Sequence, residues 1–353
     1  MTSMADSSAA VPAPEPPTPL ADGHPSREQR GHRMRVIILL VLSLLLLVLL
    51  AISGWYLLFR QPIDTLPIPL PGASTPLPAF VAAIDGPSKP VGIAVSPSGD
   101  RVYVAETGGD RMLMVYDGKG NLLKKSAPPE TTVAGRVPTY IAVNPATGEV
   151  YVTDRVTSSI DVFGADGSFE HLYKPDPSVG AWRPLGLAFD PAGNLYVSDT
   201  QDNNNRVIEL DASGRIVRTF GQPGSFSAPN ALALDAAGNL YVVDGSHGRL
   251  VAFAPDGSQI GQVSQGLGPG ELGLPRGVAI DTAGRVEVAD ATGHVVQVYK
   301  LDPAAKEFSY VGSLGAEGRG DGQFEYPNGV ATDTRGRLYV ADMYNDRYQV
   351  WSY

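Results

Sequence analysis

The chain has 353 residues, no cysteine and a formal net charge of −10, with 27 Lys and Arg against 37 Asp and Glu. A nucleic-acid-binding protein needs a basic surface to neutralise phosphates, so this charge balance argues against that class of partner. Without cysteine, disulfide bonds cannot stabilise the fold.

The first 78 residues differ in composition from the rest of the chain. Residues 1–35 are rich in Pro, Ala and Ser and have no apolar periodicity, which predicts a disordered tail. Residues 36–59 carry no charge and consist mainly of Leu, Val and Ile, which predicts a single transmembrane helix. The alternative is a cleavable signal peptide, whose apolar core is shorter, about 7–15 residues.

Basic residues beside this span predict its orientation. Four arginines precede it and one follows it closely, namely Arg27, Arg30, Arg33, Arg35 and Arg60. The positive-inside rule predicts a single-pass cell-membrane protein with a cytoplasmic tail and an extracytoplasmic C-terminal domain. Residues 60–78 contain prolines at 62, 67, 69, 71, 76 and 78, which predicts an extended stalk.

A six-fold repeat occupies residues 79–353. Its copies open with a proline, in most cases as Pro-x-Gly, at Pro90, Pro138, Pro184, Pro229, Pro275 and Pro327. The spacings are 48, 46, 45, 46 and 52 residues. A period in this range, with several short strands per unit, is typical of a β-propeller blade. The sequence therefore predicts an all-β, six-bladed β-propeller.

The third copy illustrates the four strands a to d of one blade. Residues 184–189 form a nearly continuous apolar run, as expected for an innermost strand a that is buried on both faces. The turn Asp190–Asn194 has Pro and Gly at favoured turn positions. Strands b, c and d are predicted at 195–199, 206–210 and 215–220, and strand d alternates apolar and polar residues, as a solvent-facing strand should.

The ends of the repeat indicate how the ring closes. The sixth copy stops at Tyr353 without a strand d, and residues 79–85 form a strand-like segment that no other copy uses. We expect this N-terminal segment to supply the missing strand, with Phe80, Val81 and Ile84 packed against the sixth blade, so that no long edge remains open. Because that strand runs toward the Pro-x-Gly loops, its start lies under the opposite Asp-x-x-Gly turns.

Several motifs resemble the NHL repeat. They are Asp199 with Asn205 and Arg206, Asp342 with Asn345 and Arg347, and the linkers 268–272 and 320–324. The resemblance implies a six-bladed propeller that most often binds proteins. One span, a Pro-rich stalk and an external propeller are also similar to the sensor half of mycobacterial receptor Ser/Thr kinases, although 35 residues cannot hold a kinase. Copies two and five depart from the pattern, with Ser159 and Val295 where others have Arg.

An acid ends strand b in every copy: Glu106, Asp154, Asp199, Asp244, Asp290 and Asp342. A ring of carboxylates would suit calcium. Because the acid recurs once per blade, we favour a structural role in which it caps its loop and pairs with the Arg that begins strand c. The oxygen-rich loop 199–205 lacks the spacing of an EF-hand, so we interpret it as a solvated loop.

Enzymatic propellers provide the alternative function, a hydrolase or lyase with an unrecognised site. Lactonases resembling the gluconolactonase/regucalcin family hold a metal at the channel mouth with one Glu, two Asn and one Asp. The corresponding positions here are Val91, Thr139, Leu185, Asn230, Arg276 and Asn328, which lack the acids. A related amidating lyase would need converging histidines, and the repeat has only His171, His247 and His294. We therefore predict no metal, cofactor or catalytic residue.

A binding surface remains, because strands d and b both lead into loops on one face. The longest of these loops, 126–138, 172–184, 263–275 and 315–327, contain aromatic and Arg residues of the kind enriched at interface hot spots. We expect Phe324 to pack between blades and leave Tyr326 open between packing and binding. The candidate ligand-binding residues are Trp182, Arg183, Tyr173, Asn230, Arg276, Tyr326 and Asn328. The predicted partner is a protein or a cell-envelope component.

Overall fold

The protein is described from a computed structural model that covers residues 41–43, 46–48 and 76–353, without residues 130, 202–204, 223 and 267. The chain divides into two compact units, Met1–Ala73 and Ser74–Tyr353. In the first unit, the described segments 41–43 and 46–48 are helical. The predicted tail 1–35, most of the predicted span 36–59 and residues 60–75 of the predicted stalk lie outside the described residues. Within the segments that are described, no helix is long and apolar enough to cross a membrane.

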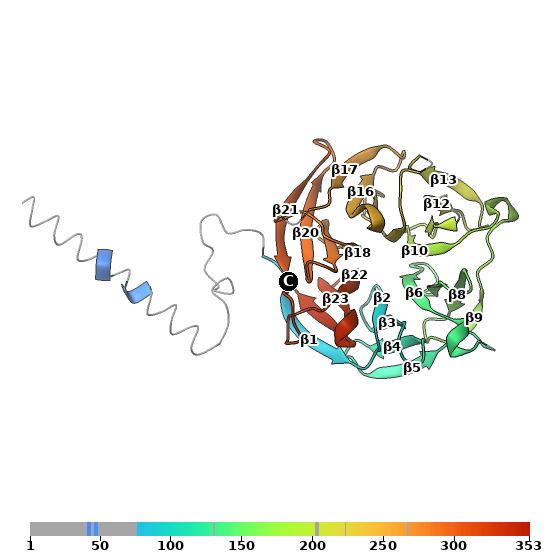
Figure 1. Cartoon of the computed structure of the whole chain (residues 1–353), viewed down its shortest axis with the longest axis horizontal. Helices are drawn as coiled ribbons and strands as arrows, with labels where there is room; N and C mark the ends of the chain where they lie inside the picture. Colours follow the sequence, from blue (N-terminus) through green and yellow to red (C-terminus); the bar gives the residue numbers. More distant parts are fainter. Residues whose placement is uncertain are drawn as a thin grey trace, which may run out of the picture. The chain divides into compact units, whose positions relative to one another are not determined.

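The described part of the second unit folds into six four-stranded antiparallel sheets. Blades one to three comprise β2 (Pro90–Val95), β3 (Arg101–Glu106), β4 (Leu113–Asp117), β5 (Leu122–Ser126); β6 (Pro138–Val143), β7 (Val150–Asp154), β8 (Ser159–Phe163), β9 (Phe169–Leu172); and β10 (Pro184–Phe189), β11 (Leu195–Asp199), β12 (Arg206–Leu210), β13 (Ile216–Phe220). Blades four to six comprise β14 (Pro229–Leu234), β15 (Leu240–Asp244), β16 (Arg249–Phe253), β17 (Gln259–Val263); β18 (Pro275–Ile280), β19 (Arg285–Asp290), β20 (Val295–Asp302), β21 (Glu307–Leu314); and β22 (Pro327–Thr332), β23 (Arg337–Asp342), β24 (Arg347–Ser352), β1 (Ala79–Asp85). The sheets surround a central axis as propeller blades, which confirms the predicted fold (Figure 1).

Turn chemistry and burial explain why each copy folds into a blade. In blade three, Gly193 has a φ of 88°, and the backbone N–H of Asn194 donates to the Asp190 carboxylate at 2.8 Å. This left-handed position favours glycine and reverses the chain between β10 and β11. The innermost strand β10 has four buried and two partly buried residues, whereas the outer strand β13 alternates partly buried and exposed residues before its buried last residue, Phe220. The predicted inner and outer strands are therefore confirmed.

Glycine in Pro-x-Gly allows the innermost strands to approach each other closely. A Cβ atom at Gly92 would collide with the carbonyl oxygen of Thr139 in the next blade, and one at Gly277 would collide with that of Asn328. Copies two and four carry Tyr140 and Ala231 at this position instead of glycine. The inner ring is therefore not uniform around the axis.

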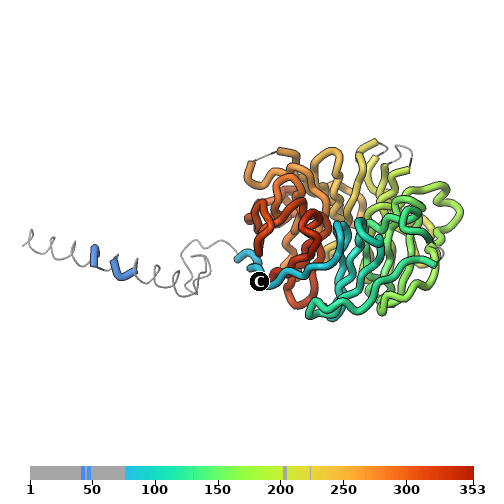
Figure 2. The backbone as a smooth tube through the Cα atoms, turned by 60° about the horizontal axis from the view of Figure 1, so that its bottom comes forward, coloured from blue at the N-terminus to red at the C-terminus, as the bar shows by residue number. Residues whose placement is uncertain are grey.

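The ring closes with the N-terminal strand, as predicted. Strand β1 pairs antiparallel with β24, from Ala79 opposite Ser352 to Asp85 opposite Arg347, and lies beside the last strands (Figure 2). The Phe80 ring packs edge-on against Trp351, with ring centroids 5.8 Å apart. The register shifts between Phe80 and Ala82, and Val81 in this irregularity is 57% exposed. The expectation that Val81 packs in the closing strand is wrong, because the bulge turns it toward solvent.

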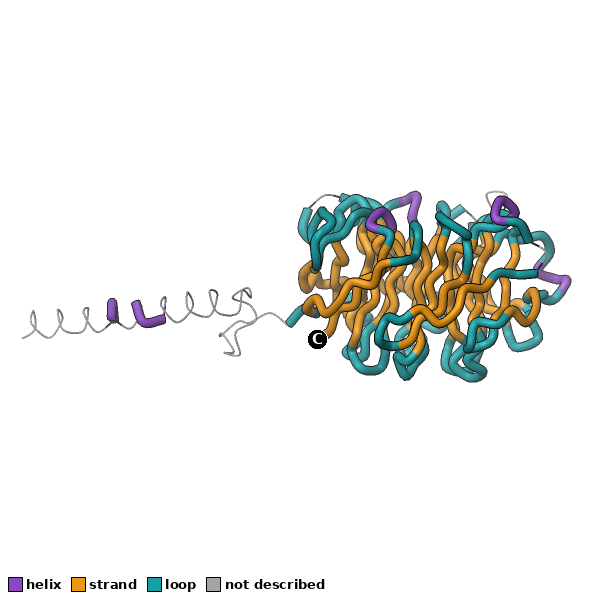
Figure 3. The backbone as a smooth tube through the Cα atoms, turned by 90° about the horizontal axis from the view of Figure 1, so that it is seen from below, coloured by secondary structure: helices purple, strands orange, loops and turns teal. Residues whose placement is uncertain are grey.

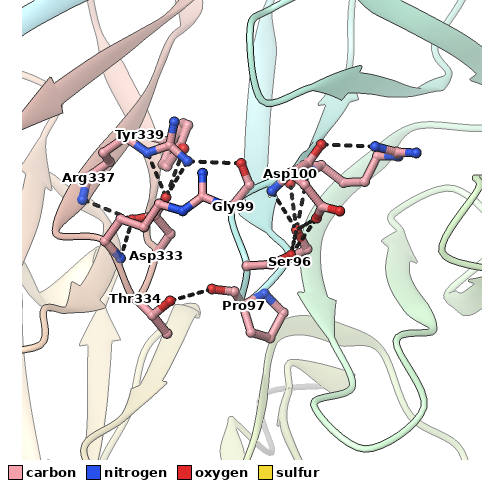
Figure 4. A network of polar contacts seen from close by, with 11 residues as sticks. Ser96, Pro97, Gly99, Asp100, Asp333, Thr334, Arg337 and Tyr339 are labelled. Carbon is pink, nitrogen blue, oxygen red and sulfur yellow. Dashed lines mark hydrogen bonds and ion pairs between the residues drawn. The ribbon is translucent and has the colours of Figure 1, made fainter.

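A second set of contacts joins the first and last blades at the turns between strands a and b (Figure 4). Arg337 donates to the carbonyl oxygen of Gly99 at 2.9 Å and forms an ion pair with Asp333 at 2.7 Å. The Thr334 hydroxyl donates to the carbonyl oxygen of Pro97 at 2.8 Å. These bonds link residues 237 and 238 positions apart and reinforce the closure made by β1.

The two faces of the propeller differ in structure. Among the described residues, three short 3-10 helices lie on one face, η2 (Val133–Gly135), η5 (Gly245–His247) and η6 (Met343–Asn345), whereas η3 (Pro177–Val179) lies at the side, next to Asp176, whose backbone bonds Gly214 (Figure 3). We call the face with the three helices, which also carries the loops that connect blades, the loop face. The opposite side, the turn face, carries the Asp-x-x-Gly turns. Strand β1 starts on the turn face, because Ala79 pairs with Ser352 and Tyr353 bonds the turn residue Gly336.

Candidate functional site

Four of the seven predicted site residues surround the channel mouth on the loop face. Asn230, Arg276 and Asn328 each follow the proline that begins an innermost strand, so the ring of blades directs these positions toward the axis. Val91 and Leu185 occupy the same position in blades one and three and belong to the apolar cluster beneath the mouth. The mouth is therefore apolar on one side and polar on the other.

Arg276 and Tyr326 form the centre of the polar side. The Arg276 guanidinium donates to the Tyr326 hydroxyl at 2.9 Å and lies 5.8 Å from the centroid of its ring. The Tyr326 ring also packs against Tyr344, with centroids 5.0 Å apart. Tyr326 has a φ of 62°, an unfavourable backbone conformation for an aromatic residue. Its half-buried ring contributes to packing and also holds Arg276 at the mouth.

Two asparagines place unpaired amide groups in the same region. Asn230 is 3% exposed and Asn328 is 5% exposed. The Oδ1 atom of Asn328 and the Nε atom of Arg276 make no hydrogen bond of normal geometry with the described residues. The Asn230 amide makes none either, although it lies near enough to the Tyr140 hydroxyl to oppose the rise that burial causes in the pKa of that group. Burying a polar group without a partner is costly. These atoms are therefore able to bond a ligand that enters the mouth.

Tyr140 also lies at the mouth and was not among the residues predicted from the sequence. It stands where four other copies have glycine, and its hydroxyl reaches the carbonyl oxygen of Arg276 at 3.4 Å. Burial raises the pKa of Tyr140 to about 12, although the positive charge of Arg276 opposes the shift. Below it, the innermost strands leave a cavity of only about 40 Å³. The replacement of glycine by Tyr140 in the Pro-x-Gly motif of copy two is the sequence feature that could have indicated this residue.

The other three predicted residues form a separate group where blades two and three meet. The rings of Tyr173 and Trp182 lie 6.2 Å apart, and Tyr173 also packs on Tyr151 at 5.8 Å. Trp182 and Tyr173 are both partly buried against the core between these blades, whereas Arg183 is exposed. The backbone N–H of Arg183 donates to Asp199 at 2.9 Å. The group is thus an exposed cation beside a rigid aromatic pair.

The acids at the ends of the b strands mostly have the predicted structural role. Asp199, Asp244 and Asp342 pair with Arg206, Arg249 and Arg347 at 3.0, 2.9 and 2.8 Å. In the first blade, the predicted pair of the acid with the arginine at the start of strand c does not form. Glu106 accepts a hydrogen bond from the backbone of Ser88, while Arg111 donates to the carbonyl oxygens of Val133 and Arg136. Arg111, at a φ of 55°, points into the next loop instead of toward the acid.

Phe324 and the remaining candidate groups have structural contacts. Phe324 is fully buried and packs on Trp351 at 5.7 Å, as predicted. The His247 ring contacts Asp244 at 2.7 Å, and His294 accepts a 3.4 Å hydrogen bond from the backbone of Tyr326. Among the described residues, no three His, Asp or Glu side chains converge as metal ligands. Residues 202–204 of the oxygen-rich loop lie outside the described part.

No family model matches this chain, and no curated protein sequence matches it. Several solved structures match the chain in fold. A streptogramin B lyase is 16% identical, with 78% of this chain and 96% of that chain covered and a TM-score of 0.53. A chain of a nidogen/laminin complex is 19% identical, covering 72% and 86%, with a TM-score of 0.54. A protein of unknown function from Bacteroides thetaiotaomicron is 17% identical, covering 79% and 72%, with a TM-score of 0.58. At these identities the likeness establishes the propeller fold alone, and NHL remains a resemblance of motifs.

Proposed function

We propose that this protein is a scaffold or sensor whose propeller binds a protein or cell-envelope ligand on its loop face. The observation that carries the proposal is the pairing of exposed Arg183 with Trp182, which packs on Tyr173 at 6.2 Å. Trp and Arg are enriched among residues that dominate interface energies. An anchor already fixed by its neighbours loses little conformational entropy when it binds.

The channel mouth would provide a second contact area for the same ligand. Arg276, Tyr326 and Asn328 present a guanidinium, a phenol and an unpaired amide oxygen. Such groups suit a carboxylate or the peptide groups of a loop. A nidogen/laminin complex among the similar structures is consistent with a propeller that engages another protein.

The proposal includes anchoring of the propeller outside the cell by residues 36–59. It rests on their uncharged apolar sequence and on the arginines that precede them. Protease added to intact cells should degrade the propeller and spare the N-terminal tail. A soluble mature form that begins near Gly54 would instead indicate a cleaved signal peptide.

Site-specific photocrosslinking in cells tests the binding face. A crosslinking amino acid is placed at Arg183 on the loop face or, as a matched control, at Arg335 on the turn face. Both side chains are exposed. We expect the same partner, identified by mass spectrometry, to be captured from position 183 and not from position 335. Capture from position 335 alone would place the ligand on the turn face and overturn the proposal.

An enzymatic function is the second candidate. The unpaired buried atoms of Asn230, Asn328 and Arg276 favour it, because active sites often contain polar groups that await a substrate. Similar structures include a virginiamycin B lyase bound to quinupristin, which makes quinupristin a suitable first substrate. Incubation with quinupristin, followed by mass spectrometry, should reveal a cleaved product only if this alternative is right. Turnover that Arg276→Ala abolishes would place the chemistry at the mouth.

A further inference from the structure

Blades three, four and six share a bridge in which an arginine joins two parts of the same blade. In blade six, Arg347 donates to the Asp342 carboxylate at 2.8 Å and to the carbonyl oxygens of Gly320 and Gln323 at 2.8 and 2.7 Å. Those carbonyl groups belong to the loop that leads into the blade. Arg206 and Arg249 make the same two kinds of contact in blades three and four. The arginine thus fills the groove between the incoming loop and strand c.

Blade five lacks this arginine but keeps its hydrogen bonds. Val295 stands opposite Asp290, in the register position of Arg347 opposite Asp342. Two residues later, Gln297 donates to Asp290 at 3.2 Å and to the carbonyl oxygen of Glu271 in the incoming loop at 2.6 Å. Blade six has the same amide beside its arginine, where Gln349 donates to Asp342 and to the carbonyl oxygen of Gln323, so blade five retains the amide contacts and lacks only the guanidinium.

Blade two has neither the arginine nor the glutamine. Ser159 stands opposite Asp154 in the register position of the arginine, and Asp161 stands where blade five has Gln297. Asp154 and Asp161 are 1% and 4% exposed, and neither takes part in an ion pair with a described residue. Asp154 accepts hydrogen bonds from the backbone N–H groups of Val137, Val156 and Thr157. Asp161 is less well compensated, because one of its oxygens accepts from the Ser159 hydroxyl at 2.9 Å and no described residue bonds the other. An uncompensated buried carboxylate is energetically costly.

A cavity of about 520 Å³ opens at this position, which is in the size range of small-ligand sites. Asp154, Ser159 and Asp161 line it together with Phe169, Leu172 and Pro128. The carboxylates suit a cationic head group, and the apolar wall suits a methylene stem.

The cations around the cavity do not neutralise these acids. Arg136 directs its guanidinium at the carbonyl oxygens of Asp110, Arg111 and Thr131. His171 and Lys174 are exposed at the rim.

We infer that the groove of blade two binds an arginine side chain of a protein partner, which supplies from outside the guanidinium that blades three, four and six supply from their own strand c. This inference rests on the proposed binding function for its setting and adds the chemistry of one contact. The groove adjoins Tyr173, because it is lined by Leu172 and Lys174 on either side of that residue. A partner anchored at Trp182 and Arg183 would therefore have this groove within reach.

Peptide binding to the full chain tests the inference. The probe is a fluorescent Ala-Arg-Ala peptide, compared with a citrulline analogue of the same shape without the charge and with a lysine analogue. We expect the arginine peptide to bind at least about tenfold more tightly than either analogue, as a charge-assisted bidentate contact would. Binding should weaken as the pH falls below about 6, because burial raises the pKa of Asp161 to about 6 and protonation removes its charge. Equal binding of the arginine and citrulline peptides would overturn the inference, and equal binding of the lysine peptide would overturn the assignment of a guanidinium.

Two matched variants locate the binding. Ser159→Arg should fill the groove, abolish peptide binding and raise the melting temperature by pairing with Asp154 and Asp161. Val295→Arg adds the same residue to blade five and should leave binding unchanged. Undiminished binding to Ser159→Arg would contradict the site. Crosslinking from Arg183 is a separate readout, so a partner captured there without arginine-dependent peptide binding would retain the proposed function and reject this contact.

Discussion

The hydroxyl group of Tyr353 donates a 2.6 Å hydrogen bond to the carboxylate of Glu287. The Arg285 guanidinium lies 3.5 Å from the centroid of the Tyr353 ring and donates to the carbonyl oxygen of Pro76 at 3.1 Å. The last residue of the chain and the segment before β1 therefore both contact blade five. Closure of the ring extends beyond the pairing of β1 with β24.

This contact predicts a pH-dependent stability. Burial raises the pKa of Glu287 to about 7, although its hydrogen bond with Tyr353 opposes the shift. Because the unfolded chain releases this proton at lower pH, the free energy of unfolding should fall as the pH rises from about 4.5 to about 7. Glu287→Gln should remove about 2 kcal/mol of that fall between pH 5 and pH 8, measured by urea unfolding. The exposed Glu307→Gln is the control, and the same pH profile for both variants would contradict the prediction.

The closing strand provides a prediction about packing. Phe80→Ala should lower the free energy of unfolding by about 2–3 kcal/mol, because the half-buried ring packs on Trp351. Val81→Ala, on the same strand and 57% exposed, should change it by less than about 0.5 kcal/mol. Chemical denaturation measures both. Equal effects at the two positions would show that β1 packs differently from the structure.

The arginine bridge provides a prediction about buried charge. Arg206→Ala should destabilise the fold by about 3 kcal/mol, because it leaves the fully buried carboxylate of Asp199 without its cation. Arg215→Ala in the same blade should cost less than about 1 kcal/mol, since Arg215 is 67% exposed in its pair with Asp211. Thermal unfolding of both variants makes the comparison. A small effect of Arg206→Ala would mean that the bridge contributes little to stability.

The aromatic anchor should separate binding from stability. Arg183→Ala should weaken binding of the partner identified by crosslinking by more than about 2 kcal/mol. It should leave the melting temperature unchanged, because the Arg183 side chain is exposed. Trp182→Ala should weaken binding and also lower the melting temperature, because the ring packs against the core between blades two and three. Arg335→Ala on the turn face should alter neither quantity. Unchanged affinity in Arg183→Ala would remove this residue from the interface.

The sequence alone determined the blades and their closure, because these depend on local information that each copy repeats. The turn at Asp190–Asn194 shows why. Its carboxylate and Gly193 reverse the chain wherever the motif occurs, and the flanking apolar runs then form the inner strands. The strand predicted at 79–85 could pair only with strand c of the sixth copy, because that copy has no strand d of its own. The predicted pairs of Asp199 with Arg206 and of Asp342 with Arg347 also follow from short spacing along one blade.

Only the tertiary structure decided which departures from the repeat gather into sites. Tyr140 meets Arg276 across the channel, although 136 residues separate them in sequence. The bulge that exposes Val81 depends on the register with β24. Ser159 was the visible departure in copy two, and only its comparison in register with blades three to six showed that Asp154 and Asp161 line a groove without the cation that the acids of blades three, four and six have. Such contacts depend on how separate copies pack together, and local sequence patterns carry no information about that packing.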